Sequence, residues 1–356
     1  MNFENYFGFR TRDIVYAIAI VFFIFLITFL SRTSRISKSQ AVIGTKNTHI
    51  ILQDDVNLDS LISILESSQI EYDEEELRWV SPLLGWRNFK KGYYKFDGEY
   101  SYNEFLTKLA FGSQDPVSIT ILPGITVERF ARNLSREMSF DSSEVMSVFN
   151  DSLFLSSKKL SKEQLFGRML PNTYDVYWTL SSEQTIERVL SEFESRVIGP
   201  YKNRVDSLDY SIDDIIAMAS IVEWEANIED EKPIVAGLYW NRLKRRMHLQ
   251  ADPTISFAVG ERRRLLLADY KVEHPFNTYI YLGLPPGPVT NPSLQTIRAT
   301  LYPDDHQFLY MVANPEGGHI FNRTYEQHLE DAEKWRAWLR QQYRIKRQRE
   351  LQESED

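Results

Sequence analysis

The longest hydrophobic stretch of the chain lies close to its N-terminus. Ile14 to Leu30 reads IVYAIAIVFFIFLITFL without a charged residue, just long enough to cross the hydrocarbon core of a bilayer. We therefore predict a transmembrane helix over residues 14–31, preceded by a short N-terminal segment, residues 1–13. A cleaved signal peptide fits less well, because the first small-x-small triplet, Ser39-Gln40-Ala41, lies far beyond the apolar run. A helix buried in a protein core is the other alternative.

The next part of the chain has the pattern of a small α/β domain. Residues 32–47 are polar and have no helical or strand period, as in a linker. Within residues 48–115, apolar positions between Leu58 and Leu65 recur at helical spacing, and GYYKF at 92–96 is typical of a strand. Ser101 is a predicted N-cap for a second helix that ends before Gly112.

Residues 116–345 have the pattern of a larger domain in which helices dominate. The strand-like VSITIL precedes a series of helix starts, which we place at Thr126, Ser142, Ser161, Ser181 and Ser211. From Tyr325 a long helix leads into a charged tail, residues 346–356. The predicted fold class is α+β, with an N-terminal transmembrane helix, a small α/β domain and a larger helix-dominated α+β domain.

Composition and charge exclude several classes of protein. The 41 Lys and Arg against 50 Asp and Glu give a net charge of −9, which argues against binding to nucleic acid. The lack of cysteine removes disulfides, thiolate nucleophiles and Cys-ligated metals. Arg10 and Arg12 precede the apolar run while Arg32, Arg35 and Lys38 follow it, so charge alone does not decide the orientation of the span.

The common signatures of nucleophiles and cofactors are missing from the sequence. It contains no Gly-x-Ser-x-Gly elbow, no Gly-x4-Gly-Lys phosphate loop and no His-Glu-x-x-His zinc helix. His319 and His328 have no close partner at metal-ligand spacing, so ordinary polar histidines are the simpler interpretation. We expect no metal and no organic cofactor.

One helix ends in two carboxylates that are candidates for acid–base chemistry. Ser211 begins it, Ile215 to Val222 is apolar almost all round, and Glu223 and Glu225 follow. Two residues apart on a helix means a rotation of about 200°, so one carboxyl group should enter a cleft while the other is paired or solvated. A carboxyl group held against apolar neighbours has a raised pKa, as a general acid requires. Spacing does not choose between them, and a capping or ion-pair role for either remains open.

Three loop segments after this helix have the composition of a carbohydrate-binding surface. Amide, hydroxyl and aromatic side chains alternate there with Pro and Gly, which suits sugar hydroxyl and acetamido groups. Turn formation and helix capping are the alternative explanation for the same residues. The candidates for substrate binding are Asn241, Gln250, Asp252, Thr254, Asn277, Tyr279, His319 and Asn322.

Five ordered motifs in this region resemble the YceG-like family, the MltG-type endolytic murein transglycosylases. They are ASIVEWEA, VAGLYWNRL, LQADPT, FNTYIYLGLPPGPVTNPS and LYMVANPEGGHIFN. The resemblance extends to GYYKF, ILPGITVERFARNL and LPNTYDVYW, and so covers most of the chain after the apolar run. The chain differs from the family pattern at two positions. Trp224 stands between the two glutamates where Lys is common, and Phe276 replaces the usual Tyr before Asn-Thr-Tyr.

The resemblance implies a single-pass enzyme of the inner (plasma) membrane with a cytoplasmic N-terminus and a periplasmic body. Residues 48–115 would form a LysM-like domain and residues 116–345 the YceG-like catalytic domain. The implied reaction is that of a lyase, a lytic transglycosylase that cleaves the MurNAc–GlcNAc β-1,4 bond within nascent glycan strands of peptidoglycan and leaves 1,6-anhydro-MurNAc ends. Such cleavage would terminate strand elongation, which makes peptidoglycan synthases candidate partners.

The resemblance also assigns roles to residues. The catalytic acid of the family corresponds to the second Glu of the E-x-E motif, Glu225, and the other motifs place Asn241, Gln250, Asp252, Asn277 and Tyr279 in the cleft. Two other functions compete with this one. One is a muramidase-type hydrolase that uses Glu225 with Asp252 as the second carboxylate, and the other is a non-catalytic glycan-binding scaffold of the cell-wall synthesis machinery.

Overall fold

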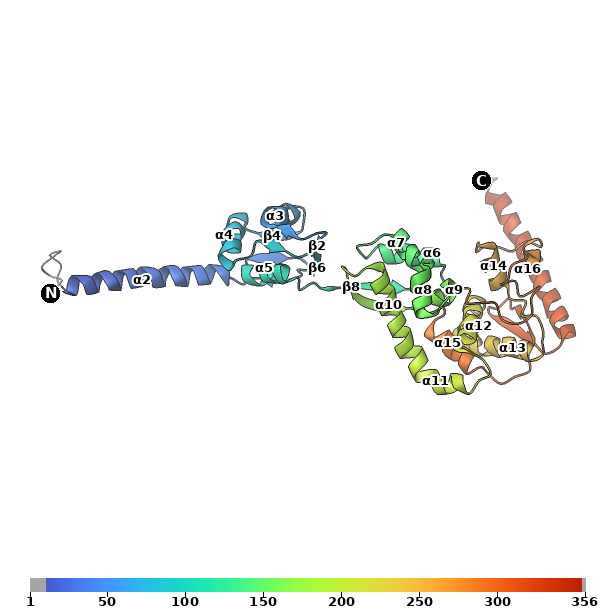
Figure 1. Cartoon of the computed structure of the whole chain (residues 1–356). Helices are drawn as coiled ribbons and strands as arrows, with labels where there is room; N and C mark the ends of the chain where they lie inside the picture. Colours follow the sequence, from blue (N-terminus) through green and yellow to red (C-terminus); the bar gives the residue numbers. More distant parts are fainter. Residues whose placement is uncertain (1–10, 354–356) are drawn as a thin grey trace. The chain divides into compact units, whose positions relative to one another are not determined.

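The structure is a computed structural model that describes residues 11–353 (Figure 1). Its contacts divide the chain into two compact units. The first runs to Val117 and includes Asp175–Thr179, and the second comprises Ser118–Tyr174 and the chain from Leu180 onward. Helices predominate over short strands, so the predicted α+β class with a helix-rich body is confirmed.

The N-terminal helix α2 (Thr11–Ile36) is long and apolar enough to cross a membrane. At 26 residues it is about 39 Å long, and its side chains in the apolar stretch are exposed. The helix is longer than the predicted span of 14–31 because nothing in 32–36 breaks it, and the Thr33 hydroxyl donates back to the carbonyl of Phe29. Residues 1–10 of the predicted N-terminal segment lie outside the described residues.

The remainder of the first unit is a small α/β assembly. Its strands and helices are β1 (Val42–Gly44), β2 (His49–Leu52), β3 (Val56–Asn57), α3 (Leu58–Glu66), β4 (Ile70–Tyr72), α4 (Glu74–Leu84), β5 (Asn88–Phe89), β6 (Gly92–Lys95), β7 (Glu99–Tyr100) and α5 (Tyr102–Phe111). The sheet order is β4-β1-β7, with β2 paired to β6 and β3 to β5, all antiparallel. Ser101 caps α5 as predicted.

The predicted linker over residues 32–47 differs from the structure. The helix α2 occupies its first part, and β1 occupies residues 42–44 at the centre of the three-stranded sheet. Val42 is fully buried in the core of the unit, where Ala41 joins it. Three residues are too few for an alternating pattern to be visible in the sequence, so tertiary packing decides this strand.

The remaining elements lie in the second unit, except that the first two residues of β8 and the last three of β9 belong to the first unit. They are the ribbon strands β8 (Pro116–Ile121) and β9 (Asn172–Tyr177), and then α6 (Val127–Ser135), α7 (Ser142–Asn150), α8 (Ser152–Lys158), α9 (Lys162–Gly167), α10 (Ser182–Phe193), the π-helix η1 (Glu194–Ile198), α11 (Gly199–Asp206), α12 (Ile212–Glu225), η2 (Glu229–Glu231), α13 (Lys232–Lys244), α14 (Asp252–Val259), η3 (Asp269–Lys271), α15 (Leu294–Leu301), β10 (Tyr310–Ala313), β11 (His319–Asn322) and α16 (Tyr325–Glu353). Thr126, Ser161, Ser181 and Ser211 are N-caps at the predicted helix starts. The helix α7 begins at Ser142 as predicted, and Asp141 is its N-cap.

The helix α12 forms the centre of the second unit. Ile215 to Val222 are buried, and the helix packs against α9, α13, α14 and α15, near which it lies in Figure 1. Ser211 and Asp214 form a capping box at its start, and Ala226 leaves the helical conformation at its end. A helix that is apolar on all sides requires a protein core or a membrane around it, and α12 lies in a core. The buried helix therefore fixes the position of its last residue, Glu225.

The C-terminal helix α16 packs against the hairpin of β10 and β11. The predicted charged tail, residues 346–356, continues this helix to Glu353, because its Arg, Lys, Gln and Glu residues are all good helix formers. Residues 354–356 lie outside the described residues.

Candidate active site

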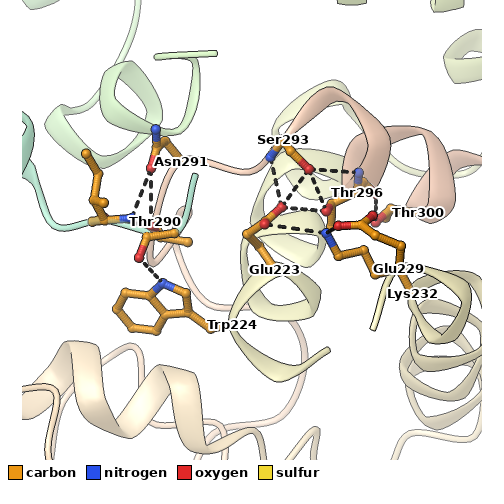
Figure 2. A network of polar contacts seen from close by, with 11 residues as sticks. Glu223, Trp224, Glu229, Lys232, Thr290, Asn291, Ser293, Thr296 and Thr300 are labelled. Atoms are coloured by element: carbon orange, nitrogen blue, oxygen red, sulfur yellow. Dashed lines mark hydrogen bonds and ion pairs between the residues drawn. The ribbon is translucent and has the colours of Figure 1, made fainter. Parts of the chain in front are cut away.

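The two carboxylates at the end of α12 have different surroundings. Figure 2 shows Glu223 between α15 and Lys232. One of its oxygens accepts hydrogen bonds from the Ser293 backbone and hydroxyl, each at 2.9 Å, and from the Thr296 hydroxyl. The Lys232 ammonium group lies 3.5 Å from the other oxygen. Glu223 is thus the paired carboxylate, and it accepts hydrogen bonds from the N-terminus of α15.

Glu225 is the carboxylate that enters a cleft. It lines an open cavity of about 1020 Å³ together with Asp252, Pro253 and Tyr270. Burial raises the pKa of Glu225 to about 7, and the negative charge of Asp252 adds to this effect. Glu225 therefore holds a proton near neutral pH and can donate it to a bound molecule. The expectation that one glutamate enters a cleft while the other is paired is confirmed.

Two residues of α13 lie behind Glu225. The buried Tyr239 hydroxyl hydrogen-bonds the Glu225 carboxyl group and, with Arg242, limits the rise of its pKa. The Arg242 guanidinium donates to the carbonyls of Leu249 at 2.6 Å and Leu309 at 2.7 Å. It therefore holds the segment that leads to Asp252 against the strand β10 region. Neither residue was predicted as a site residue from the sequence, although the hydroxyl of a buried Tyr needs a polar partner.

Asp252 is the second carboxylate of the cleft. It is exposed at the first position of α14, and it accepts hydrogen bonds from the hydroxyls of Tyr279 at 2.7 Å and Tyr270 at 3.3 Å. The two tyrosine rings meet edge to face at 4.8 Å. Burial raises the pKa of both tyrosines, and the Asp252 charge raises them further, so both remain hydrogen-bond donors.

Three other predicted site residues form hydrogen bonds within the loops that carry Asp252 and Tyr279. The Thr254 hydroxyl lies 2.8 Å from that of Thr278, and both residues are buried. Asn277 donates to the carbonyls of Val272 and Tyr270 and accepts from the backbone of Tyr279. Gln250 has a positive φ of 51°, and its side-chain oxygen accepts from Arg242. These residues shape the loops that carry Asp252 and Tyr279.

The structure places the remaining predicted residues away from the cavity. The Asn241 amide donates to the carbonyls of His306 and Phe308. His319 contacts Glu231 through its ring at 2.7 Å, and the Asn322 amide donates to Asp331. Of the predicted site residues, only Glu225 and Asp252 are among the described residues that line the cavity around Glu225.

A run of three arginines after α14 forms another wall of the cavity. Arg262, Arg263 and Arg264 line it together with Leu265, Leu266 and Leu267. The Arg262 guanidinium lies over the Trp224 ring, 4.5 Å from its centre, and both side chains donate to the carbonyl of Gly124. This segment was not predicted from the sequence, in which the RRRLLL run at residues 262–267 is the available signal.

The geometry and the family comparisons lead to one classification. The sequence profile of the YceG-like family matches residues 50–334. This α+β chain, with an acidic group of raised pKa at the end of a buried helix, belongs to the YceG-like family.

Individual proteins of known sequence or structure are similar to the chain. The endolytic murein transglycosylase of Bacillus subtilis is 26% identical over 295 residues, which cover 78% of this chain and 82% of that protein. The protein of the same name from Streptococcus pneumoniae D39 is 26% identical over 266 residues, 66% of this chain but 48% of the relative. A crystal structure of a YceG-like protein from Listeria monocytogenes superposes with a TM-score of 0.57 at 26% identity, over 83% of this chain and 99% of that one.

Proposed function

We propose that the chain is a membrane-anchored peptidoglycan lytic transglycosylase with Glu225 as its general acid and base. The observation that carries the proposal is the Glu225 carboxyl group, which lies in an open cleft with a pKa of about 7. A glycosidic bond needs a proton on its leaving oxygen, and the cleft offers one at neutral pH. The names of the similar proteins from Bacillus subtilis and Streptococcus pneumoniae support murein as the substrate.

In the proposed reaction a single carboxyl group acts twice. Glu225 first donates its proton to the glycosidic oxygen between MurNAc and GlcNAc as the bond to C1 breaks. The resulting carboxylate then takes the proton of the C6 hydroxyl, whose oxygen bonds to C1 and closes the 1,6-anhydro ring. Because the nucleophile belongs to the substrate, its proximity is provided without a second catalytic carboxylate.

Asp252 and Tyr239 would assist this cycle. The Asp252 charge raises the pKa of Glu225 and would stabilise positive charge that develops at C1. The Tyr239 hydroxyl would orient the Glu225 carboxyl group. Tyr279 and Tyr270 hold Asp252 in place, so we propose that they shape the cleft through it. Of the other predicted binding residues, Gln250, Thr254 and Asn277 would act by shaping the loops that carry Asp252 and Tyr279. A direct contact with substrate at Asn241, His319 or Asn322 would lie outside the cavity around Glu225.

The rest of the chain has a proposed place in the same function. The apolar helix α2 would be a single-pass anchor in the inner membrane, with the body in the periplasm. The first unit would be a LysM-like glycan-binding domain and the second the catalytic domain. Cleavage within nascent strands would then end their elongation beside peptidoglycan synthases.

A muramidase-type hydrolase is the second candidate, because Asp252 lies in the same cleft as Glu225. In that reaction Asp252 would act as the second carboxylate and water would attack C1. The two reactions leave different ends, since the hydrolase gives a reducing MurNAc and the transglycosylase an anhydro-MurNAc. Mass spectrometry of the products distinguishes them directly.

The test incubates the purified full chain in detergent with uncrosslinked glycan strands. We expect anhydro-ended fragments from the wild type and a loss of at least about 100-fold for Glu225→Gln. Glutamine resembles the protonated glutamate in shape, so this variant should remain folded. Reducing ends would establish the hydrolase, and a folded wild type that binds strands without cutting them would indicate a scaffold.

A matched control removes a carboxyl group from the same region outside the cleft. Glu229 is half exposed and pairs with Lys232 at 2.7 Å, and it does not line the cavity. Glu229→Gln should retain the wild-type rate. An equal loss in both variants would contradict the role of Glu225.

A further inference from the structure

The arginine wall of the cleft is not explained by the proposed chemistry. Arg262, Arg263 and Arg264 face the same cavity as Glu225 and Asp252. The groups that shift the pKa of Glu225 are Asp252, Tyr239 and Arg242, so the three arginines do not tune the acid. The sugar backbone of a glycan offers uncharged hydroxyl and acetamido groups, which do not require guanidinium groups for recognition. A negatively charged part of the ligand is the partner that arginines suit.

Arg263 has a structural task within the loop. Its guanidinium pairs with the buried Asp269 through two contacts, at 2.7 and 3.0 Å. The same carboxylate accepts from the Leu266 backbone at 2.6 Å, and the pKa of Asp269 is lowered to about 2 chiefly by the Arg263 hydrogen bond. This pair closes the loop between residues 263 and 269. The tip of the loop is thereby held in one conformation before a ligand arrives.

The other two arginines differ in their contacts. Arg262 stacks on Trp224 and donates to the carbonyl of Gly124 at 2.8 Å. Arg264 is exposed, and within residues 11–353 its guanidinium group has no hydrogen bond or ion pair. The loop therefore presents one uncommitted positive charge to the cleft, next to the exposed Leu266 and Leu267.

We propose that Arg264 determines specificity by binding a carboxylate of the stem peptide on the substrate strand. This inference rests on the proposed function. In murein the peptide is attached to the lactyl group of MurNAc, the same sugar whose C1 is attacked, so its carboxylates lie near the reacting bond. The planar guanidinium can bind a carboxylate through two hydrogen bonds. The aliphatic side chains of the peptide would contact Leu266 and Leu267.

The test compares two substrates that differ only in the charge of the peptide. Both are uncrosslinked strands released from lipid, so that no pyrophosphate contributes, and in one of them the peptide carboxylates are converted to primary amides with a carbodiimide and ammonia. The value of kcat/KM is measured for the full chain and its variants from the yield of cleaved ends. Arg264→Gln should lose about tenfold on strands with free peptide carboxylates, a typical effect of one charged contact, and should equal the wild type on amidated strands. Arg264→Lys should recover part of the loss.

The control is Arg245→Gln, which removes an exposed arginine that does not line the cavity. It should match the wild type on both substrates, and thermal unfolding checks that every variant is folded. An equal loss by Arg264→Gln on both substrates, or no loss on either, would overturn the inference while leaving the proposed function intact. A wild type that cleaves neither substrate would contradict the proposed function itself.

Discussion

At the scale of single residues, the pKa of Glu225 can be tested through its neighbour. The general acid must be protonated, so kcat/KM should fall as the pH rises through about 7, the pKa of Glu225. The Asp252 charge raises this pKa, and Asp252→Asn removes the charge. The alkaline limb of the profile should therefore move to lower pH, while burial keeps it above the ordinary value of 4.5 for a Glu carboxyl group.

The measurement is a pH profile of strand cleavage, in which the position of the limb is independent of any change in maximal rate. Asp305→Asn is the control, because this aspartate is exposed and does not line the cleft. An alkaline limb that stays in place in Asp252→Asn would mean that the two carboxylates do not interact.

The choice between the two glutamates illustrates what one sequence can predict about single residues. Helical spacing correctly places Glu223 and Glu225 on different faces of α12. The partners that distinguish them come from far along the chain, Ser293 and Thr296 for Glu223 and Asp252 for Glu225. Such contacts depend on tertiary packing, and periodicity within one helix contains no information about them. The preference for Glu225 as the candidate acid came from the resemblance to the E-x-E motif of the family.

At the scale of elements, the Glu223 network joins α12, α13 and α15. Its Lys232 side chain is only 3% exposed, and that of Glu223 is 8% exposed. Removing the charge of Glu223 leaves the buried Lys232 with the half-exposed Glu229 as its ion-pair partner, and it weakens the hydrogen bonds from Ser293 and Thr296. We expect Glu223→Gln to lower the free energy of unfolding by about 3 kcal/mol, which urea denaturation can measure.

Two further variants separate the buried charge from the hydrogen bonds. Glu223→Gln combined with Lys232→Met should recover part of the loss, because no buried charge then remains. Glu229→Gln should cost about 1 kcal/mol or less, since this partner of Lys232 is half exposed. Equal stability of the wild type and Glu223→Gln would show that the network contributes nothing to the fold.

The start of a helix was easier to predict than a short strand. Ser101, Thr126, Ser161, Ser181 and Ser211 each accept a hydrogen bond from the backbone three residues later, a local interaction that the sequence states directly. The strand β1 has only three residues, and it pairs with β4 and β7, which follow much later. Elements whose stability comes from distant partners therefore escape a local analysis.

At the scale of the whole molecule, the sequence predicted the order of the parts better than their limits. The apolar helix, the α/β unit and the helix-rich unit follow one another as expected, but the helix α2 runs on to Ile36 instead of ending near residue 31. Its last turn belongs to the first unit, because Arg35 pairs with Glu76 and lies over the Trp79 ring at 4.1 Å. Ile36 also packs against the core of that unit.

These contacts decide where the chain can be shortened. A variant that begins at Ser34 keeps Arg35 and Ile36, and all the residues that line the cleft lie in the second unit. We expect this variant to be soluble without detergent and to cleave free strands with the kcat/KM of the full chain. In vesicle flotation the full chain should rise with the lipid and the variant should not, since about 20 apolar residues are what a span requires. A shortened chain that still floats would point to a second membrane contact, for which the exposed Leu266 and Leu267 beside Arg264 would be the first residues to substitute.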